Sequence, residues 1–249
     1  MTAEVTLLAT RWVSFRRESY VRNTQSIPII TLFPAGKVES VTHARGERAA
    51  LCDLLDRLGP DAPTLCDGWT TYDLAAHLVL RERRLDAAAG IALKPLAGHT
   101  AAVQESLKAR HPYPELVGLV RRPGGVYGLV PFLDDAVNTL EMFVHHEDVR
   151  RAQPDWEPRT MPEDLDRLMW KRVSAGGRLM LRRSPVGVVL HRTGGGVALG
   201  GPRIGPKVEV TGPAPELLLF CFGRQEHARV ELTGAPEAIS RLKSAHLGI

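Results

Sequence analysis

The sequence predicts an α+β protein in which a four-helix bundle precedes a small α+β domain. Four successive segments between residues 43 and 152 repeat apolar residues at helical spacing. A proline-containing linker, Pro154–Pro162, follows them. Beyond the linker, short runs rich in valine stand among glycines, which is typical of strands and tight turns. We therefore expect a bundle over residues 40–153 and an α+β domain over residues 154–249.

The first two helices are predicted from their ends. Residues 43–58 place alanines and leucines on one face, and Gly59-Pro60 ends that helix. Thr70 and Asp73 then have the spacing of a capping box, with Asp in place of the usual Glu or Gln. A second helix should begin there and run to about Gly90.

Two further helices complete the predicted bundle. A helical region over residues 100–122 is broken near residues 111–114, where two prolines stand. The last helix covers residues 134–152 and ends in Arg150-Arg151, whose cations complement the negative end of the helix dipole. Short apolar faces on four helices favour an antiparallel bundle.

The C-terminal part alternates helical and extended patterns. Gly194–Gly196 lacks the lysine of a phosphate loop, so a hairpin turn is expected there. Helices are predicted at 165–182, 215–222 and 236–243, and extended segments at 186–191, 208–211 and 228–232.

The first 39 residues have no sustained period of 2 or 3.6. We expect a disordered extension, or extra residues from an upstream start codon, in preference to a targeting peptide.

Composition narrows the class of protein. Of 249 residues, 44% are apolar and 24% are charged, which suits a globular core. No run of about 18 apolar residues exists to span a membrane. Three cysteines without a CxxC pair suit a reducing cytoplasm. The net charge is +4, half of it in residues 1–40, and the short basic pairs are scattered and not interleaved with aromatics, so no nucleic-acid partner is expected.

The segment that carries chemistry lies in the fourth predicted helix. Glu141 and His145 are four residues apart and project from one face, and Asn138 lies on the same stripe. On a surface helix this polar stripe would simply face water. His77, in contrast, stands within the most apolar run of the second helix.

A buried histidine is often satisfied within the core, yet a neutral imidazole needs partners at both ring nitrogens. If the second and fourth helices pack together, Glu141 and His145 converge on His77. Two imidazoles and one carboxylate form a three-ligand set with an open position for Zn²⁺. Fe²⁺ and Ni²⁺ accept the same ligands.

The remaining candidate residues are expected to support the site or to have no part in it. His146 points about 100° away from His145 and is expected at the surface or supporting the ligands. Glu82, with Arg81 or Arg84, lies one or two turns beyond His77 and is expected at the mouth of the site. Cys66 has no histidine adjacent in sequence, so a nucleophilic role is disfavoured. Cys52 and Cys221 stand among apolar residues and are expected in the core.

The segment from Cys66 through Trp69, Asp73 and His77, followed by Glu141-x-x-x-His145, resembles a known family. It is similar to the DinB-like bundles of the mycothiol-dependent maleylpyruvate isomerase family, and more closely to a subgroup described only as metal-binding proteins. The resemblance extends from about residue 41 to the C-terminus and leaves the N-terminal extension without a counterpart.

The resemblance implies a divalent metal, usually taken as zinc, bound by His77, Glu141 and His145. It implies that the metal holds the mycothiol sulfur as a thiolate that attacks an electrophilic carbon. The C-terminal part resembles a sterol-carrier-like domain. There Arg224 stands where the family often has an arginine facing the site, and it is our catalytic candidate as a donor to a substrate or cofactor carboxylate. A simple helix-end cation is the alternative.

The leading prediction is a metal-dependent transferase or isomerase that uses mycothiol and a small-molecule substrate. One alternative is a hydrolase with metal-bound hydroxide and Asp73, Glu82 or Asp148 as base. Another is a non-catalytic protein that binds a metal or an apolar ligand. Substrate, metal identity and oligomeric state do not follow from the sequence.

Overall fold

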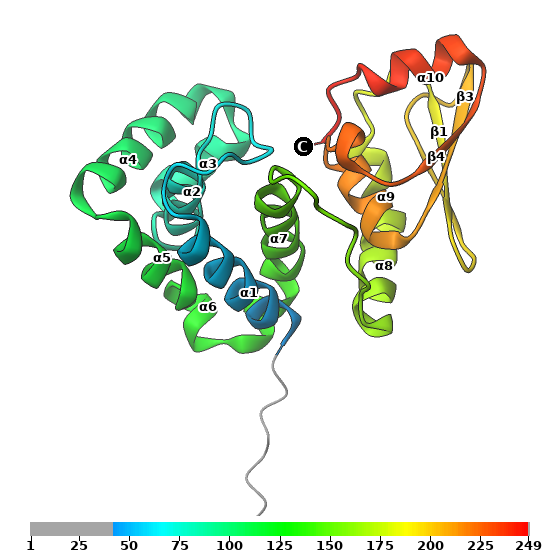
Figure 1. The fold of residues 1–249 in the computed structure, drawn as a ribbon. Helices are drawn as coiled ribbons and strands as arrows, with labels where there is room; N and C mark the ends of the chain where they lie inside the picture. Colours follow the sequence, from blue (N-terminus) through cyan, green and yellow to red (C-terminus); the bar gives the residue numbers. More distant parts are fainter. Residues whose placement is uncertain (1–41, 249) are drawn as a thin grey trace, which may run out of the picture. The chain divides into compact units, whose positions relative to one another are not determined.

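The structure is a computed structural model and describes residues 42–248, so the predicted extension over residues 1–39 lies outside the described residues (Figure 1). The helical region comprises α1 (His43–Leu58), α2 (Thr71–Arg83), α3 (Leu85–Ala92), the 3-10 turn η1 (Lys94–Leu96), α4 (Ala97–Arg110), α5 (Tyr113–Arg121), α6 (Gly125–Leu129) and α7 (Pro131–Arg151). The C-terminal region comprises α8 (Glu163–Met180), β1 (Gly187–Arg192), β2 (Val197–Gly200), β3 (Lys207–Gly212), α9 (Ala214–Cys221), the 3-10 turn η2 (Gln225–His227), β4 (Glu231–Gly234) and α10 (Pro236–Lys243).

This arrangement confirms the predicted fold class, a helical region followed by a small α+β region with a four-stranded sheet. The predicted second helix is wrong beyond Arg83, because Arg84 leaves helical geometry at φ −127° and ψ 68° and α3 starts afresh. The predicted break between α4 and α5 is confirmed. Helix α6 and strand β2 were not predicted, because five and four residues are too few to show a period.

The sheet has the strand order β2-β1-β3-β4. Strand β1 pairs antiparallel with β2 and parallel with β3, and β4 pairs antiparallel with β3. The turn between β1 and β2 uses Gly194–Gly196, whose φ values of 90° to 115° are accessible to glycine. Val208 and Val210 alternate inward along β3, where α9 packs on the strand, and α8 packs against β2 and α9. Among residues 42–248, no helix combines the length and hydrophobicity of a membrane span.

Helix α7 is the element shared by both apolar cores. Met142 and Val149 belong to the core formed mainly by α1, α2, α4 and α5. Phe143 and Val144 belong instead to the core of the C-terminal region. The helix packs closely on α1 along the bundle (Figure 1). Its remaining stripe is polar and points into the bundle, which places the site described below.

Buried ion pairs connect the two regions through the linker. Arg159 donates to Glu47 of α1 and to Glu147 of α7 at 2.9 and 2.6 Å. Arg151, also on α7, donates to Glu147 and to Glu216 of α9 at 2.6 Å each. These contacts join α1, α7, the linker and α9. The predicted domain boundary between residues 153 and 154 stays a prediction.

The charge on Glu47 should therefore stabilise the protein. Burial alone would raise its pKa, but hydrogen bonds from His146 and Arg159 lower it from 4.5 to about 2. A lowered pKa stabilises the fold above pH 4.5, and this contribution is lost as the pH falls through about 2.

Replacing Glu47 by Gln should lower the free energy of unfolding at pH 7 by roughly 3 kcal/mol, as expected from a shift of this size. The difference from the unmodified protein should shrink below pH 4.5. Urea denaturation at pH 7, 4 and 3 measures it, with the exposed Glu231→Gln as control. An equal loss for both variants would contradict the prediction.

Candidate metal centre

His77 is set in place by the start of α2. The predicted capping box is present, since Asp73 accepts a hydrogen bond from the Thr70 backbone N–H at 2.9 Å. One turn later His77 is buried, 7% exposed, and its ring packs against Trp69 with ring centroids 4.9 Å apart. The helix start and the Trp69 ring thus fix the imidazole inside the bundle.

Helix α7 supplies the facing residues. Glu141 Oε1 lies 3.3 Å from His145 Nε2, as expected for residues four apart on one face. The His145 ring meets the His77 ring edge-on at a centroid distance of 5.5 Å. One ligand atom from each of His77, Glu141 and His145 lies within 4.8 Å of the others. The structure therefore brings the three predicted ligands together.

The polar stripe of α7 does not face water. Asp134, Asn138 and Asp148 are 0% exposed. Asn138 donates to Asp134 at 2.7 Å and accepts from Arg81 at 2.5 Å. The interpretation of this stripe as a solvated surface is wrong, because arginine side chains from other elements cover it: Arg48 of α1 donates to Asp134, Arg81 of α2 to Asn138 and Arg224 to Asp148.

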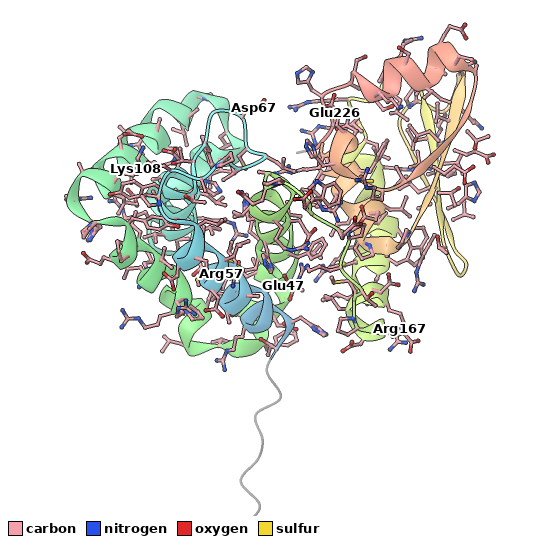
Figure 2. The ribbon with its side chains drawn as sticks, viewed as in Figure 1. Glu47, Arg57, Asp67, Lys108, Arg167 and Glu226 are labelled. Carbon is pink, nitrogen blue, oxygen red and sulfur yellow. The ribbon has the colours of Figure 1, made fainter. Side chains whose placement is uncertain are left out.

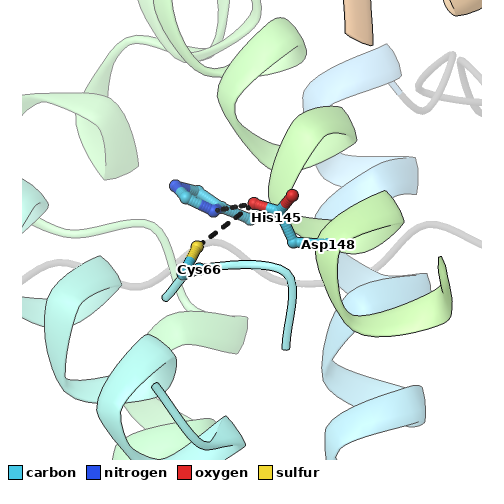
Figure 3. A group of neighbouring side chains, drawn as sticks. All are labelled: Cys66, His145 and Asp148. Atoms are coloured by element: carbon cyan, nitrogen blue, oxygen red, sulfur yellow. Dashed lines mark hydrogen bonds and ion pairs between the residues drawn. The ribbon is translucent and has the colours of Figure 1, made fainter. Parts of the chain in front are cut away.

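Asp148 holds the other side of His145. Its Oδ2 lies 3.0 Å from His145 Nδ1, which leaves Nε2 turned toward Glu141 (Figure 3). Carboxylate partners of this kind orient histidines that ligate metals. From the sequence, Asp148 was expected only as a possible base. Its spacing of three residues from His145 on a helix was the signal for this supporting role.

The protonation states suit a cation. Burial, with the nearby His145, lowers the pKa of His77 to about 3, so its ring is neutral and has a lone pair to donate. Burial alone would raise the pKa of Glu141, but the hydrogen bond from His145 lowers it to about 2. Burial would lower the pKa of His145, but its hydrogen bonds to Asp148, Cys66 and Glu141 raise it well above 6.5. A cation bound at Nε2 of His145 would therefore compete with a proton for that nitrogen.

Arg224 and Cys66 surround Asp148 from outside α7. Arg224 donates to both oxygens of Asp148, from Nε at 2.8 Å and from Nη2 at 2.6 Å. Cys66 lies in the loop before α2, and its Sγ is 3.4 Å from Asp148 Oδ2 (Figure 3). Cys66, His145 and Asp148 form a second group with metal-ligand spacing. Arg224 donates two hydrogen bonds to Asp148, whereas Glu141 faces a single nitrogen of Arg81, so we favour the group with His77 and Glu141 as the cation site.

Of the residues predicted at the mouth of the site, Arg81 reaches the site and Glu82 and Arg84 do not. Glu82 is not at the mouth, because it is buried against Arg48 at 2.7 Å. Arg84 pairs with Asp86 on the surface, whereas Arg81 does reach the site, with Nε 3.1 Å from Glu141. His146 is buried and its Nδ1 is 2.9 Å from Glu47. The proximity of Cys66 to His145 was not predicted, since no local pattern in the sequence indicates a contact between a loop and a distant helix.

Comparison with known proteins identifies relatives of this arrangement. The family model described as mycothiol maleylpyruvate isomerase N-terminal domain matches residues 41–174, more than half of the chain. The crystal structure of the mycothiol-dependent maleylpyruvate isomerase is similar with a TM-score of 0.51 and 15% identity, over 77% of this chain and 90% of that one. A histidine-to-alanine mutant of that isomerase matches with a TM-score of 0.51, 14% identity and the same coverage. No curated protein matches the chain. The predicted DinB-like fold of the helical region is confirmed.

Removal of each ligand should reduce metal content. We expect His77→Ala, Glu141→Ala and His145→Ala to bind less than a tenth of the zinc bound by the unmodified protein, which is a loss of about tenfold or more for a three-ligand site. Asp148→Asn should keep the site but weaken zinc binding roughly 10–100-fold. Elemental analysis after dialysis and zinc titration measure these changes.

The exposed His99→Ala on α4 is the matched control and should retain full metal content. Unchanged metal content in all three ligand variants would show that the cation binds elsewhere.

Proposed function

Because the chain belongs to the mycothiol maleylpyruvate isomerase family, we propose that it is an enzyme that uses a low-molecular-weight thiol, mycothiol, to isomerise or derivatise an electrophilic small molecule. The observation that supports this function most directly is the convergence of His77, Glu141 and His145 from two helices. A donor set of two imidazoles and one carboxylate suits a divalent cation, with zinc as our first choice and iron or nickel as alternatives.

The bound cation would supply Lewis-acid stabilisation of the cofactor's thiolate. The chain itself supplies orientation. Asp148 keeps Nδ1 of His145 occupied, so that Nε2 faces the site. Trp69 packs against His77 and helps to fix the orientation of its ring. Glu141 is the open side of the donor set, because a quarter of its side chain is exposed.

Arg224 supports catalysis by two routes in this proposal. Its paired donation to Asp148 stabilises the carboxylate that orients His145. Its Nη1 also donates to the Phe222 carbonyl at 2.6 Å, which leaves one N–H of that nitrogen for an oxygen of the substrate or cofactor. This second route keeps Arg224 as our candidate catalytic residue.

The contacts support the hydrolase alternative less well. Burial would raise the pKa of Asp148, but His145 and Arg224 hold it well below its usual range, so it is a weak base. Asp73 is occupied by Thr70 and by Lys108 at 2.5 Å. Glu82 is buried against Arg48, outside the donor set. None of the three predicted bases is placed to activate water.

Activity should depend on both the thiol and the cation. With zinc and mycothiol, the protein should accelerate either isomerisation of maleylpyruvate or displacement of chloride from 1-chloro-2,4-dinitrobenzene, in which a C–S bond forms and chloride leaves. Glu141→Gln should lower kcat/KM about 100-fold, or ~2.7 kcal/mol in activation free energy. Initial rates followed by absorbance measure this.

The control is Glu231→Gln, an exposed change in β4 that should leave the rate unaltered. Turnover that persists at full rate without any thiol would contradict the proposed function and favour hydrolysis.

A further inference from the structure

Two cavities are lined in part by one short loop, residues 65–69. Leu65, Cys66 and Asp67 line a cavity of about 500 Å³, and the next two residues, Gly68 and Trp69, line another of about 550 Å³. Both volumes are typical of small-molecule sites. Because consecutive residues line both, the two cavities share this loop as part of their walls.

The candidate metal centre lies close to the loop at both cavities. Trp69 packs against His77, which itself lines the 550 Å³ cavity. Cys66, which lines the 500 Å³ cavity, contacts Asp148, the partner of His145. Two ligands bound in the two cavities would therefore both lie beside residues that belong to this centre or contact it.

The walls of the two cavities differ in chemistry. The 550 Å³ cavity is lined by aromatic, aliphatic and small residues together with two acidic residues, and no Arg or Lys is among its lining residues in the described part of the chain. Both acidic residues, Asp73 and Glu105, have Lys108 as their partner. We call this the apolar cavity; its lining residues include Trp69, Ile91, Ala97, Thr100, Ala101 and Gln104.

The 500 Å³ cavity is polar. Arg224, Lys243, His227 and His246 line it, together with Asp67 and Glu226, which Figure 2 labels. This mixture of donors and acceptors suits a strongly hydrated ligand, because many of its hydrogen bonds to water can be replaced.

We propose that the apolar cavity binds an uncharged, largely apolar electrophile, while the thiol cofactor occupies the polar cavity. This inference rests on the proposed function and names its substrate class. A dicarboxylate such as maleylpyruvate would lose hydration in the apolar cavity, where Lys108 is already paired with both acidic side chains and no described Arg or Lys belongs to the lining. The chain therefore acts on a different class of substrate from the isomerase whose fold it shares.

Ala101 offers a direct test, because it lines the apolar cavity on α4 and is exposed at its rim. Ala101→Arg places a cation there, and Ala101→Trp fills the same space without charge. Ala102→Arg is the matched control, since Ala102 is exposed on the same helix and does not line the cavity.

Binding is measured without turnover. The probe is 1,3-dinitrobenzene, an uncharged ring without a leaving group, added to the full-length, zinc-loaded protein. It should quench tryptophan fluorescence saturably, and Trp69→Phe should remove most of the quenching. Ala101→Arg and Ala101→Trp should weaken binding about tenfold, the usual effect of a modest misfit in an apolar pocket, whereas Ala102→Arg should not.

Turnover with mycothiol is then compared for 1-chloro-2,4-dinitrobenzene and maleylpyruvate. The unmodified protein should have the higher kcat/KM with the uncharged substrate. Ala101→Arg should lower that value about tenfold and shift the ratio of the two values toward the dianion. A preference of the unmodified protein for maleylpyruvate, or equal effects of Ala101→Arg and Ala102→Arg, would overturn the inference.

The two proposals fail in different ways. If dinitrobenzene binds at Trp69 but no electrophile reacts in a thiol-dependent manner, the proposed function is wrong and the assignment of the cavity stands. If thiol-dependent isomerisation of maleylpyruvate dominates, the proposed function stands and the assignment of the cavity is wrong.

Discussion

The buried carboxylate of Asp148 is the interaction on which the site depends. Arg224, from the segment after α9, donates hydrogen bonds to both of its oxygens. His145 on α7 and Cys66 both contact the oxygen Oδ2. Its backbone carbonyl also accepts a hydrogen bond from the Leu65 N–H at 3.0 Å, which anchors the loop before α2. A carboxylate with no exposed surface is stable only when such partners replace water. The same partners join the loop, α7 and the C-terminal region.

Helix α7 makes this possible because its three sides have different neighbours: the helical core, the C-terminal core and the polar site. Met142 faces the helical core and Phe143 faces the C-terminal core, and one turn further on His146 and Glu147 are buried in ion pairs. The polar side is then confined between them and must be satisfied internally. Buried polar networks of this kind hold their members in one arrangement when every member is paired. Rigidity of the donor set thus follows from packing on both sides of the helix.

Much of the fold and of the donor set could be predicted from the sequence, and the contacts that could not be predicted have a physical explanation. The spacing of Glu141 and His145, and the unusual place of His77 in an apolar run, are local signals that survive without knowledge of the fold. The capping box at Thr70 is local as well. The contacts of Cys66 and Arg224 with Asp148 are not local, because they join segments that are far apart in the sequence and depend on the tertiary fold. Glu82 was predicted at the mouth of the site because helical periodicity shows which side of α2 a residue occupies. It does not show which other helix lies against that side.

The shared wall between the two cavities has a thermodynamic consequence. Residues 65–69 cannot move for one ligand without changing the space offered to the other. If occupancy of the polar cavity changes the affinity of the apolar one by some factor, linkage requires the reverse effect to have the same factor. Saturation curves for the two ligands would then be interdependent even though the ligands need not touch. Five residues of irregular backbone would carry that coupling, and its sign would set whether the two ligands bind in a preferred order.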